Sequence, residues 1–210
     1  MPWGVADAGP PGDADSLRRE FNVPQNARVL LTLSRISPEK GQDLLLEKLI
    51  EWERRDDYPR EPLRLFICGD AAFMQGIRFF EKLRSLAAKL KKTRVIFPGY
   101  ATGDRKRAFF ALADLYIFPS RHESYGLTLL EALAAGLPAV CLDHHGARSV
   151  MKEEFGAIVE PSGLIPAIQH LLNDHNLLRM SSAARLFALN NRFSDQAANL
   201  AKLLSGDLPG

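Results

Sequence analysis

The sequence has few cysteines, no long apolar run and no excess of charge of one sign. Its two cysteines, Cys68 and Cys141, each lie in a short apolar run, which is typical of reduced core thiols and argues against a disulfide scaffold. No apolar stretch approaches the roughly 20 residues that span a bilayer. Met1 is followed by Pro2 and Trp3 rather than by the basic and apolar parts of a signal peptide. These absences predict a cytoplasmic protein.

Charge excludes one further class of function. The chain has 27 basic and 25 acidic residues, a balance that argues against a dedicated nucleic-acid binder, so no nucleic-acid partner is expected. What is present is ordinary globular composition, with 210 residues of which 46% are hydrophobic and 25% charged. A chain of this size buries roughly 70% of its unfolded surface and needs no metal or disulfide to fold.

The first 20 residues differ in composition from the rest. The run Gly9-Pro10-Pro11-Gly12 breaks regular structure, so residues 1–20 are predicted to be a linker or N-terminal arm and residues 21–210 a single domain. Within that domain, short apolar runs alternate with longer helical patterns, which predicts a Rossmann-like, doubly wound parallel sheet of about six strands. The expected strands are 29–33, 65–68, 95–97, 115–118, 139–142 and 157–159, and the expected helices are 42–55, 75–91, 104–112, 127–135, 163–172, 175–190 and 194–205.

Ligands of such sheets bind beyond the carboxyl ends of the strands, so the loops after the strands are the places to search. The first of these loops, residues 34–41, carries Arg35 and Lys40 ahead of a helix whose N-terminus already favours an anion. The loop fits a phosphate site, or equally a solvated loop with an Arg–Glu pair. Neither Gly-x-Gly-x-x-Gly nor a P-loop occurs in the sequence.

The fourth loop, residues 119–126, combines a strand end, a polar turn, a glycine and a helix start. Gly126 has no Cβ, so a ligand can approach its backbone closely, and the amides of Gly126, Leu127 and Thr128 would point at that ligand. Glu123 lies before the helix and Glu131 within it. Carboxylates accept hydrogen bonds from neighbouring hydroxyls, as on a sugar or ribose.

One segment of the sequence resembles a known family. The segment from His122 to Ala132, HESYGLTLLEA, is similar to the signature of retaining glycosyltransferases of the group 1 type, which include enzymes of polysaccharide biosynthesis. Further stretches match in order, and the likeness runs from about Phe21 to Leu204. These stretches are 34–41, 97–100, 113–120 and 136–140.

The resemblance implies one half of a GT-B architecture, the C-terminal domain that holds a nucleoside-diphosphate sugar. In the family pattern Arg35 and Lys40 neutralise the donor diphosphate, Glu123 contacts the transferred sugar, and Glu131 binds the ribose hydroxyls. Of these, Glu123, Arg35 and Lys40 are the expected catalytic residues. Preplaced cations stabilise the charge that the leaving diphosphate gains, so no metal or cofactor is required.

The remaining expected donor contacts are mostly backbone. Tyr125, Gly126, Leu127 and Thr128 are expected to line the sugar–phosphate site, with Tyr100 near the base of a UDP- or GDP-sugar. The expected activity is sugar transfer that needs an N-terminal acceptor-binding domain, supplied by a longer chain or a separate subunit. The alternative is a non-catalytic nucleotide-binding module for regulation or assembly. A GT-B-like epimerase is disfavoured because the charged residues match the transferases better.

The loop after the fifth strand departs from the family. It reads DHHGARSV over residues 143–150, without the second glycine and the Pro-Glu pair that the family usually has. Arg148 in this loop fits either a phosphate contact or a surface ion pair. The adjacent pair His144-His145 points to different sides and has no third ligand nearby in sequence, so it is not expected to bind a metal.

Two charged patterns have simple explanations. Asp13-Ala14-Asp15 has the spacing of a DxD metal motif, but it follows Gly-Pro-Pro-Gly rather than a strand and is typical of a linker or a helix cap. The basic face between residues 82 and 94 fits a solvated surface, with peripheral contact to anionic lipid at the inner face of a membrane as the alternative.

Overall fold

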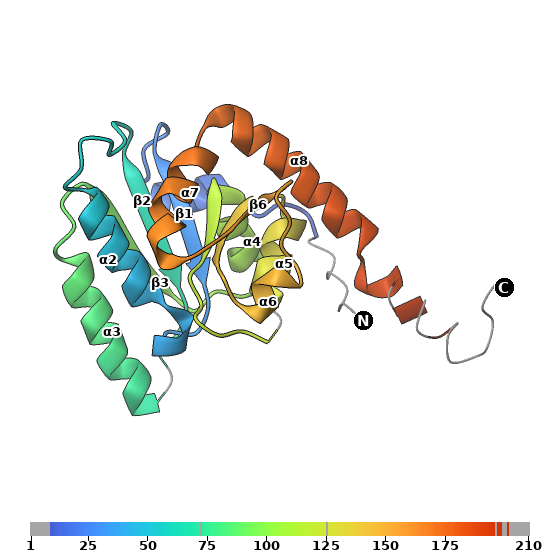
Figure 1. The fold of residues 1–210 in the computed structure, drawn as a ribbon, viewed down its shortest axis with the longest axis horizontal. Coiled ribbons are helices and arrows are strands. Elements are labelled where there is room, and N and C mark those ends of the chain that lie inside the picture. The colour runs from blue at the N-terminus through green and yellow to red at the C-terminus, as the bar shows by residue number, and fades with distance from the viewer. Residues whose placement is uncertain (1–8, 72, 125, 196, 199–200, 202–210) are drawn as a thin grey trace.

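The computed structural model describes residues 9–71, 73–124, 126–195, 197–198 and 201. Its centre is a six-stranded sheet in which every neighbouring pair is parallel, in the order β3-β2-β1-β4-β5-β6 (Figure 1). The predicted Rossmann-like fold is therefore confirmed. The strands are β1 (Arg28–Leu33), β2 (Leu63–Cys68), β3 (Thr93–Gly99), β4 (Leu115–Phe118), β5 (Ala139–Leu142) and β6 (Gly156–Val159).

Helices cover both faces of the sheet, with α2 and α3 on one side and α4 and α5 on the other (Figure 1). Helix α7 joins the first group, α1 joins the second, and α8 contributes buried side chains to both. The helices are α1 (Ala14–Glu20), α2 (Gln42–Trp52), α3 (Phe73–Ala87), α4 (Gly103–Leu112), α5 (Leu127–Ala134), α6 (His145–Arg148), α7 (Leu164–Leu171) and α8 (Asp174–Asn190), with short 3-10 helices η1 (Pro38–Lys40) and η2 (Pro161–Gly163).

The sheet divides the apolar core in two because successive side chains of a strand point to opposite faces. On β1, Val29, Leu31 and Leu33 pack in the cluster under α4 and α5, whereas Leu30 packs in the cluster under α2 and α3. Burial on both faces explains why the strands read as continuous apolar runs rather than as alternating ones.

The N-terminal arm is more ordered than the glycine–proline run suggested. Asp13 accepts a hydrogen bond from the Ser16 amide at 2.9 Å and so caps α1, which selects the helix-cap interpretation of this acidic pair. Leu17 of α1 is only 2% exposed and belongs to the core. The packed part of the chain therefore begins before Phe21.

The other predicted elements agree with the structure to within a few residues. Helix α2 ends at Trp52 and α3 at Ala87, earlier than the expected 55 and 91. Beyond α3 the amides of Lys91, Lys92 and Thr93 donate to the carboxylate of Glu53 instead of continuing the helix. The expected helix 194–205 lies partly outside the described residues.

The strand order reverses between β1 and β4, which pair through Leu30 with Leu115 and Leu31 with Tyr116. The loops after these strands therefore lie side by side at the switch point, where ligands of doubly wound sheets bind. Both cysteines are free and buried, as expected. Within the described part of the chain no helix has the length and apolarity to cross a membrane.

Candidate functional site

A hollow of about 440 Å³ lies between the loops that follow β1 and β4. Six of the predicted site residues meet there: two cations, one carboxylate and three residues at the start of α5. The lining residues are Ser34, Arg35, Lys40, Glu123, Ser124, Gly126, Leu127 and Thr128.

An ion pair joins the two loops across this hollow. The Lys40 ammonium donates to the Glu123 carboxylate, and the two side chains are only 11% and 21% exposed. Gly41 makes this approach possible, since its φ is +66° and a Cβ there would lie 1.9 Å from the Pro119 carbonyl oxygen. The pair places a cation and a carboxylate, 83 positions apart in sequence, side by side in one site.

Arg121 ties the Glu123 loop to the first loop. Its amide donates to the Glu39 carbonyl at 2.8 Å, and its guanidinium donates to the Pro38 carbonyl and, at 2.9 Å, to Asp43 Oδ1 on α2. The sequence prediction missed this residue. The only signal was its place two positions before Glu123 in a loop already suspected of function.

Asp43 is the buried centre of this connection. Besides Arg121 it accepts a hydrogen bond at 2.7 Å from Lys82 of α3. Burial favours a higher pKa for the Asp43 carboxyl, but the hydrogen bonds from Lys82 and Arg121 outweigh that effect and hold the pKa below its ordinary value. One ionised carboxylate thus fixes α2, α3 and the loop after β4.

The start of α5 offers backbone donors to the hollow. Gly126 has a φ of +73°, and a Cβ at this position would lie 3.2 Å from the Phe118 ring. The amides of Leu127 and Thr128 belong to the first helical turn, where no carbonyl of the same helix can accept from them. The Thr128 hydroxyl oxygen accepts a hydrogen bond of 2.9 Å from the Tyr116 hydroxyl.

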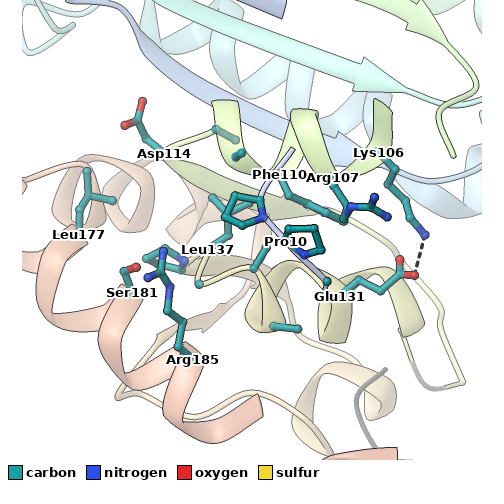
Figure 2. A pocket seen from close by; sticks show the side chains of 18 of the residues that line it. Pro10, Lys106, Arg107, Phe110, Asp114, Glu131, Leu137, Leu177, Ser181 and Arg185 are labelled. Atoms are coloured by element: carbon teal, nitrogen blue, oxygen red, sulfur yellow. Dashed lines mark hydrogen bonds and ion pairs between the residues drawn. The ribbon is translucent and has the colours of Figure 1, made fainter. Parts of the chain in front are cut away.

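Glu131 lies one helical turn beyond Thr128 on α5, outside the lining of the 440 Å³ hollow. Its Oε1 is 2.6 Å from the Lys106 ammonium of α4. This pair stands at the end of a second, larger groove of about 740 Å³ between α4, α5, α8 and the arm around Pro10 (Figure 2). The predicted ribose carboxylate therefore faces a cation that the sequence prediction did not include.

Three other predicted residues are less enclosed or undescribed. Arg35 lines the hollow, but its side chain is 71% exposed and lies 3.7 Å from the Glu39 carboxylate, which is the Arg–Glu pair of the alternative interpretation. Tyr100 follows β3 and is 71% exposed, away from the lining of the hollow. Tyr125 lies outside the described residues.

In the loop after β5, Arg148 makes two hydrogen bonds to Asp143, at 2.5 and 2.6 Å, so it forms the surface ion pair. These bonds lower the pKa of the Asp143 carboxyl. The His144 ring is buried, which lowers its pKa, and its Nδ1 accepts from the Ala147 amide at 3.1 Å. No cluster of three metal-ligating side chains occurs among the residues that the structure describes.

A family model described as glycosyl transferases group 1 matches residues 13–187. The chain belongs to this family. A D-inositol 3-phosphate glycosyltransferase of Geodermatophilus obscurus is 34% identical over 196 residues, 90% of this chain and 42% of that protein. A GDP-mannose-dependent alpha-(1-6)-phosphatidylinositol monomannoside mannosyltransferase of Mycolicibacterium smegmatis is 31% identical over 211 residues, 94% of this chain and 53% of that protein.

Solved structures of other proteins show the same fold. Anabaena HepE in complex with UDP superposes with a TM-score of 0.81 at 23% identity, over 97% of this chain and 56% of that protein. A sucrose-phosphate synthase from Thermosynechococcus elongatus gives a TM-score of 0.77 at 22% identity, over 98% of this chain and 52% of that protein. This group 1 chain has the Rossmann-like architecture of one half of a GT-B fold, and it spans about half the length of the curated relatives that it matches.

Proposed function

We propose that this chain is the donor-binding half of a retaining, metal-independent glycosyltransferase, and that the hollow between the β1 and β4 loops holds the diphosphate of a nucleoside-diphosphate sugar. The observation that carries the proposal is the partly buried pair of Lys40 and Glu123 beside the amides at the start of α5. A cation and helix-start amides attract phosphate, and a carboxylate accepts from sugar hydroxyls.

The reaction requires most of all that the negative charge on the leaving diphosphate be stabilised. The bond between the anomeric carbon and the diphosphate breaks, its electron pair stays on the diphosphate, and the acceptor hydroxyl bonds to the carbon while the departing phosphate takes its proton. Lys40 and Arg35 would stabilise the growing negative charge, and Glu123 would orient the sugar. Two preplaced cations do the work that other transferases assign to a metal.

The rest of the donor would extend along α5 and toward β3. Glu131 would accept from the ribose hydroxyls, the backbone of Gly126 and Leu127 would line the diphosphate, and Tyr100 would lie near the base. The names of the relatives support a UDP- or GDP-sugar, since HepE was solved with UDP-glucose and the mycobacterial relative is named GDP-mannose-dependent.

The acceptor belongs to another part of the protein. The curated relatives are about twice as long, which supports a second, acceptor-binding domain across the cleft. We expect it to complete the enzyme in the cytoplasm, with a peripheral membrane contact where the acceptor is a lipid.

One observation favours a second candidate, a module that binds nucleotide without transferring sugar. The loop after β5 lacks the second glycine and the Pro-Glu pair of the family, and its Arg148 is held by Asp143 rather than directed at a donor. Such a module would keep the nucleotide site and lose contacts to the sugar.

The first test is binding of UDP, GDP, ADP and CDP to the chain by calorimetry, with magnesium or with EDTA. One nucleotide should bind equally in both conditions, and Lys40→Ala should weaken it by about 1–3 kcal/mol, the range for charge-assisted hydrogen bonds. Lys48→Ala, which removes an exposed ion pair with Glu51 on α2, is the matched control. Binding of no nucleotide, or unchanged affinity in Lys40→Ala, refutes the proposed site.

A second measurement separates the two candidates. The chain alone should transfer no sugar, and the donor half of an enzyme should become active when the acceptor domain of a related transferase is added or fused. Nucleotide binding with no affinity gained from the sugar of UDP-glucose or GDP-mannose would favour the module.

A further inference from the structure

The pair of Lys106 and Glu131 links two helices at the end of the larger groove. Figure 2 shows the Lys106 side chain reaching from α4 to the carboxylate on α5, with a distance of 2.6 Å between Nζ and Oε1. The other carboxylate oxygen, Oε2, accepts no hydrogen bond from any residue that the structure describes. Among those residues, the carboxylate is therefore held at one oxygen only.

Stability alone is a weak reason for this pair. The two side chains are 27% and 31% exposed. Ion pairs near the surface contribute little to folding, because water screens the attraction and ordering two long side chains costs entropy. Orientation of the carboxylate is a better account of the contact.

Two other cations, Arg107 and Arg185, line the same groove and lie against other residues. Arg107, the next residue on α4, pairs with Asp104 on its own helix. Arg185 of α8 lies against Gly136, where an added Cβ would be 2.3 Å from its Nε. Among the residues that the structure describes, Lys106 is the one cation that donates to Glu131.

We propose that Lys106 is a positioning residue that holds Glu131 ready for a ribose and so makes the site select ribonucleotides over deoxyribonucleotides. This inference rests on the proposed function. A carboxylate has about four acceptor positions, and an ammonium at Oε1 leaves the remaining positions for the two neighbouring hydroxyls of a ribose. The ammonium also fixes the rotamer of Glu131, so that less side-chain entropy is lost when the nucleotide binds.

The test compares the affinities of UDP and 2′-deoxy-UDP, and of GDP and 2′-deoxy-GDP, by calorimetry. In Lys106→Met the preference for the ribonucleotide should fall by about three- to tenfold, through weaker binding of the ribonucleotide, because a charge-assisted arrangement is lost. The affinity for the deoxynucleotide should stay within about twofold. Lys106→Arg should restore most of the preference, since it returns a cation to the same place.

Two further variants make the result specific. Lys48→Met removes an exposed lysine–glutamate pair of 2.8 Å on α2 and should leave the preference unchanged. In a Glu131→Gln background, Lys106→Met should have no additional effect on the preference, because the group that it positions is already altered. The melting temperature of each variant shows that it is folded.

The outcomes separate the inference from the proposed function. A wild-type preference for ribonucleotides that survives Lys106→Met overturns the positioning role and leaves the proposed function intact. Equal weakening of ribo- and deoxyribonucleotides also overturns it, because that would make Lys106 a general attractor of anions. If the wild-type chain binds neither UDP nor GDP, the proposed function fails and the role of Lys106 fails with it.

Discussion

Replacing Asp43 by Asn should destabilise the fold and loosen the site at once. Asn keeps the shape of the side chain but removes the charge that accepts from Lys82 at 2.7 Å and from Arg121 at 2.9 Å. Lys82 and Arg121 then lose the negative charge with which both of them pair. Arg121 is also the residue that fastens the Glu123 loop to Pro38.

The size of the effect follows from burial. The Asp43 side chain is 10% exposed, but Lys82 and Arg121 are 49% and 40% exposed, so solvent screens part of each interaction. Buried hydrogen bonds to a charged group contribute about 1.5–3 kcal/mol each, and Asn can still accept one hydrogen bond. After this discount we expect a loss of about 2 kcal/mol in the free energy of unfolding, equivalent to about 4–8 °C in melting temperature for a domain of this size.

The pH dependence has a definite sign. Because the pKa of Asp43 is lowered in the folded state, its stabilisation is present above the ordinary pKa of 3.8 and is lost as the pH falls through the folded value. Urea unfolding at pH 6 and pH 3 should therefore show a gap between wild type and Asp43→Asn that narrows in acid. Asp56→Asn is the control, because Asp56 is exposed and forms no ion pair with the described residues.

A gap below about 0.5 kcal/mol at pH 6 would refute the role of Asp43, since surface substitutions alone produce changes of that size. A gap that stays constant between pH 6 and pH 3 would mean that shape rather than charge is responsible. The same variant should bind nucleotide more weakly, and unchanged affinity would show that the Glu123 loop does not depend on Arg121.

Three further predictions concern the fold around the site. Gly41→Ala should lower the free energy of unfolding by more than about 2 kcal/mol, because the added Cβ meets the Pro119 carbonyl in a left-handed backbone. Thermal unfolding measures this loss. Gly103→Ala, also at positive φ but with nothing within 4 Å of the added Cβ, should lower the free energy of unfolding by less. Burial raises the pKa of both cysteine thiols, so Ellman's reagent should modify neither in the native protein and both in denaturant; a fast native reaction would contradict their burial. Burial also raises the pKa of Asp114, so the stability of wild type relative to Asp114→Asn should fall as pH rises from about 4 to 7 in urea titrations, and a rise would reverse the inferred sign.

The sequence was sufficient for the sheet because the local signals agree. Each strand is a short apolar run bounded by glycine, proline or a polar residue, and burial on both faces leaves little ambiguity about its type. One topological rule, that ligands bind beyond the carboxyl ends of the strands, pointed to the loops that carry Lys40, Glu123 and Gly126. The family resemblance then joined these residues in one site. The rule predicts which loops carry the site but no contact between individual side chains.

Side-chain connections across the fold were beyond such rules. Arg121 and Asp43 are 78 positions apart, and Lys106 and Glu131 are 25 apart, so their pairing depends on helix packing that no local pattern encodes. The packing of the N-terminal arm against the core was not predicted, for a related reason. Its glycine–proline run breaks regular structure, but Leu17 lies just beyond it and finds a place in the core only once α4 is present.

The pairing of β1 with β4 joins parts of the chain that are made at different times. During synthesis Lys40 leaves the ribosome before Glu123. Two complete strand–helix units, β2–α3 and β3–α4, are made between the two loops. The site therefore forms late in folding, and a fragment that ends before β4 cannot acquire it. A nucleotide bound to both loops would link them and stabilise the pairing of β1 with β4. It would therefore slow amide hydrogen exchange in β1 and β4 more than in the outer strand β3.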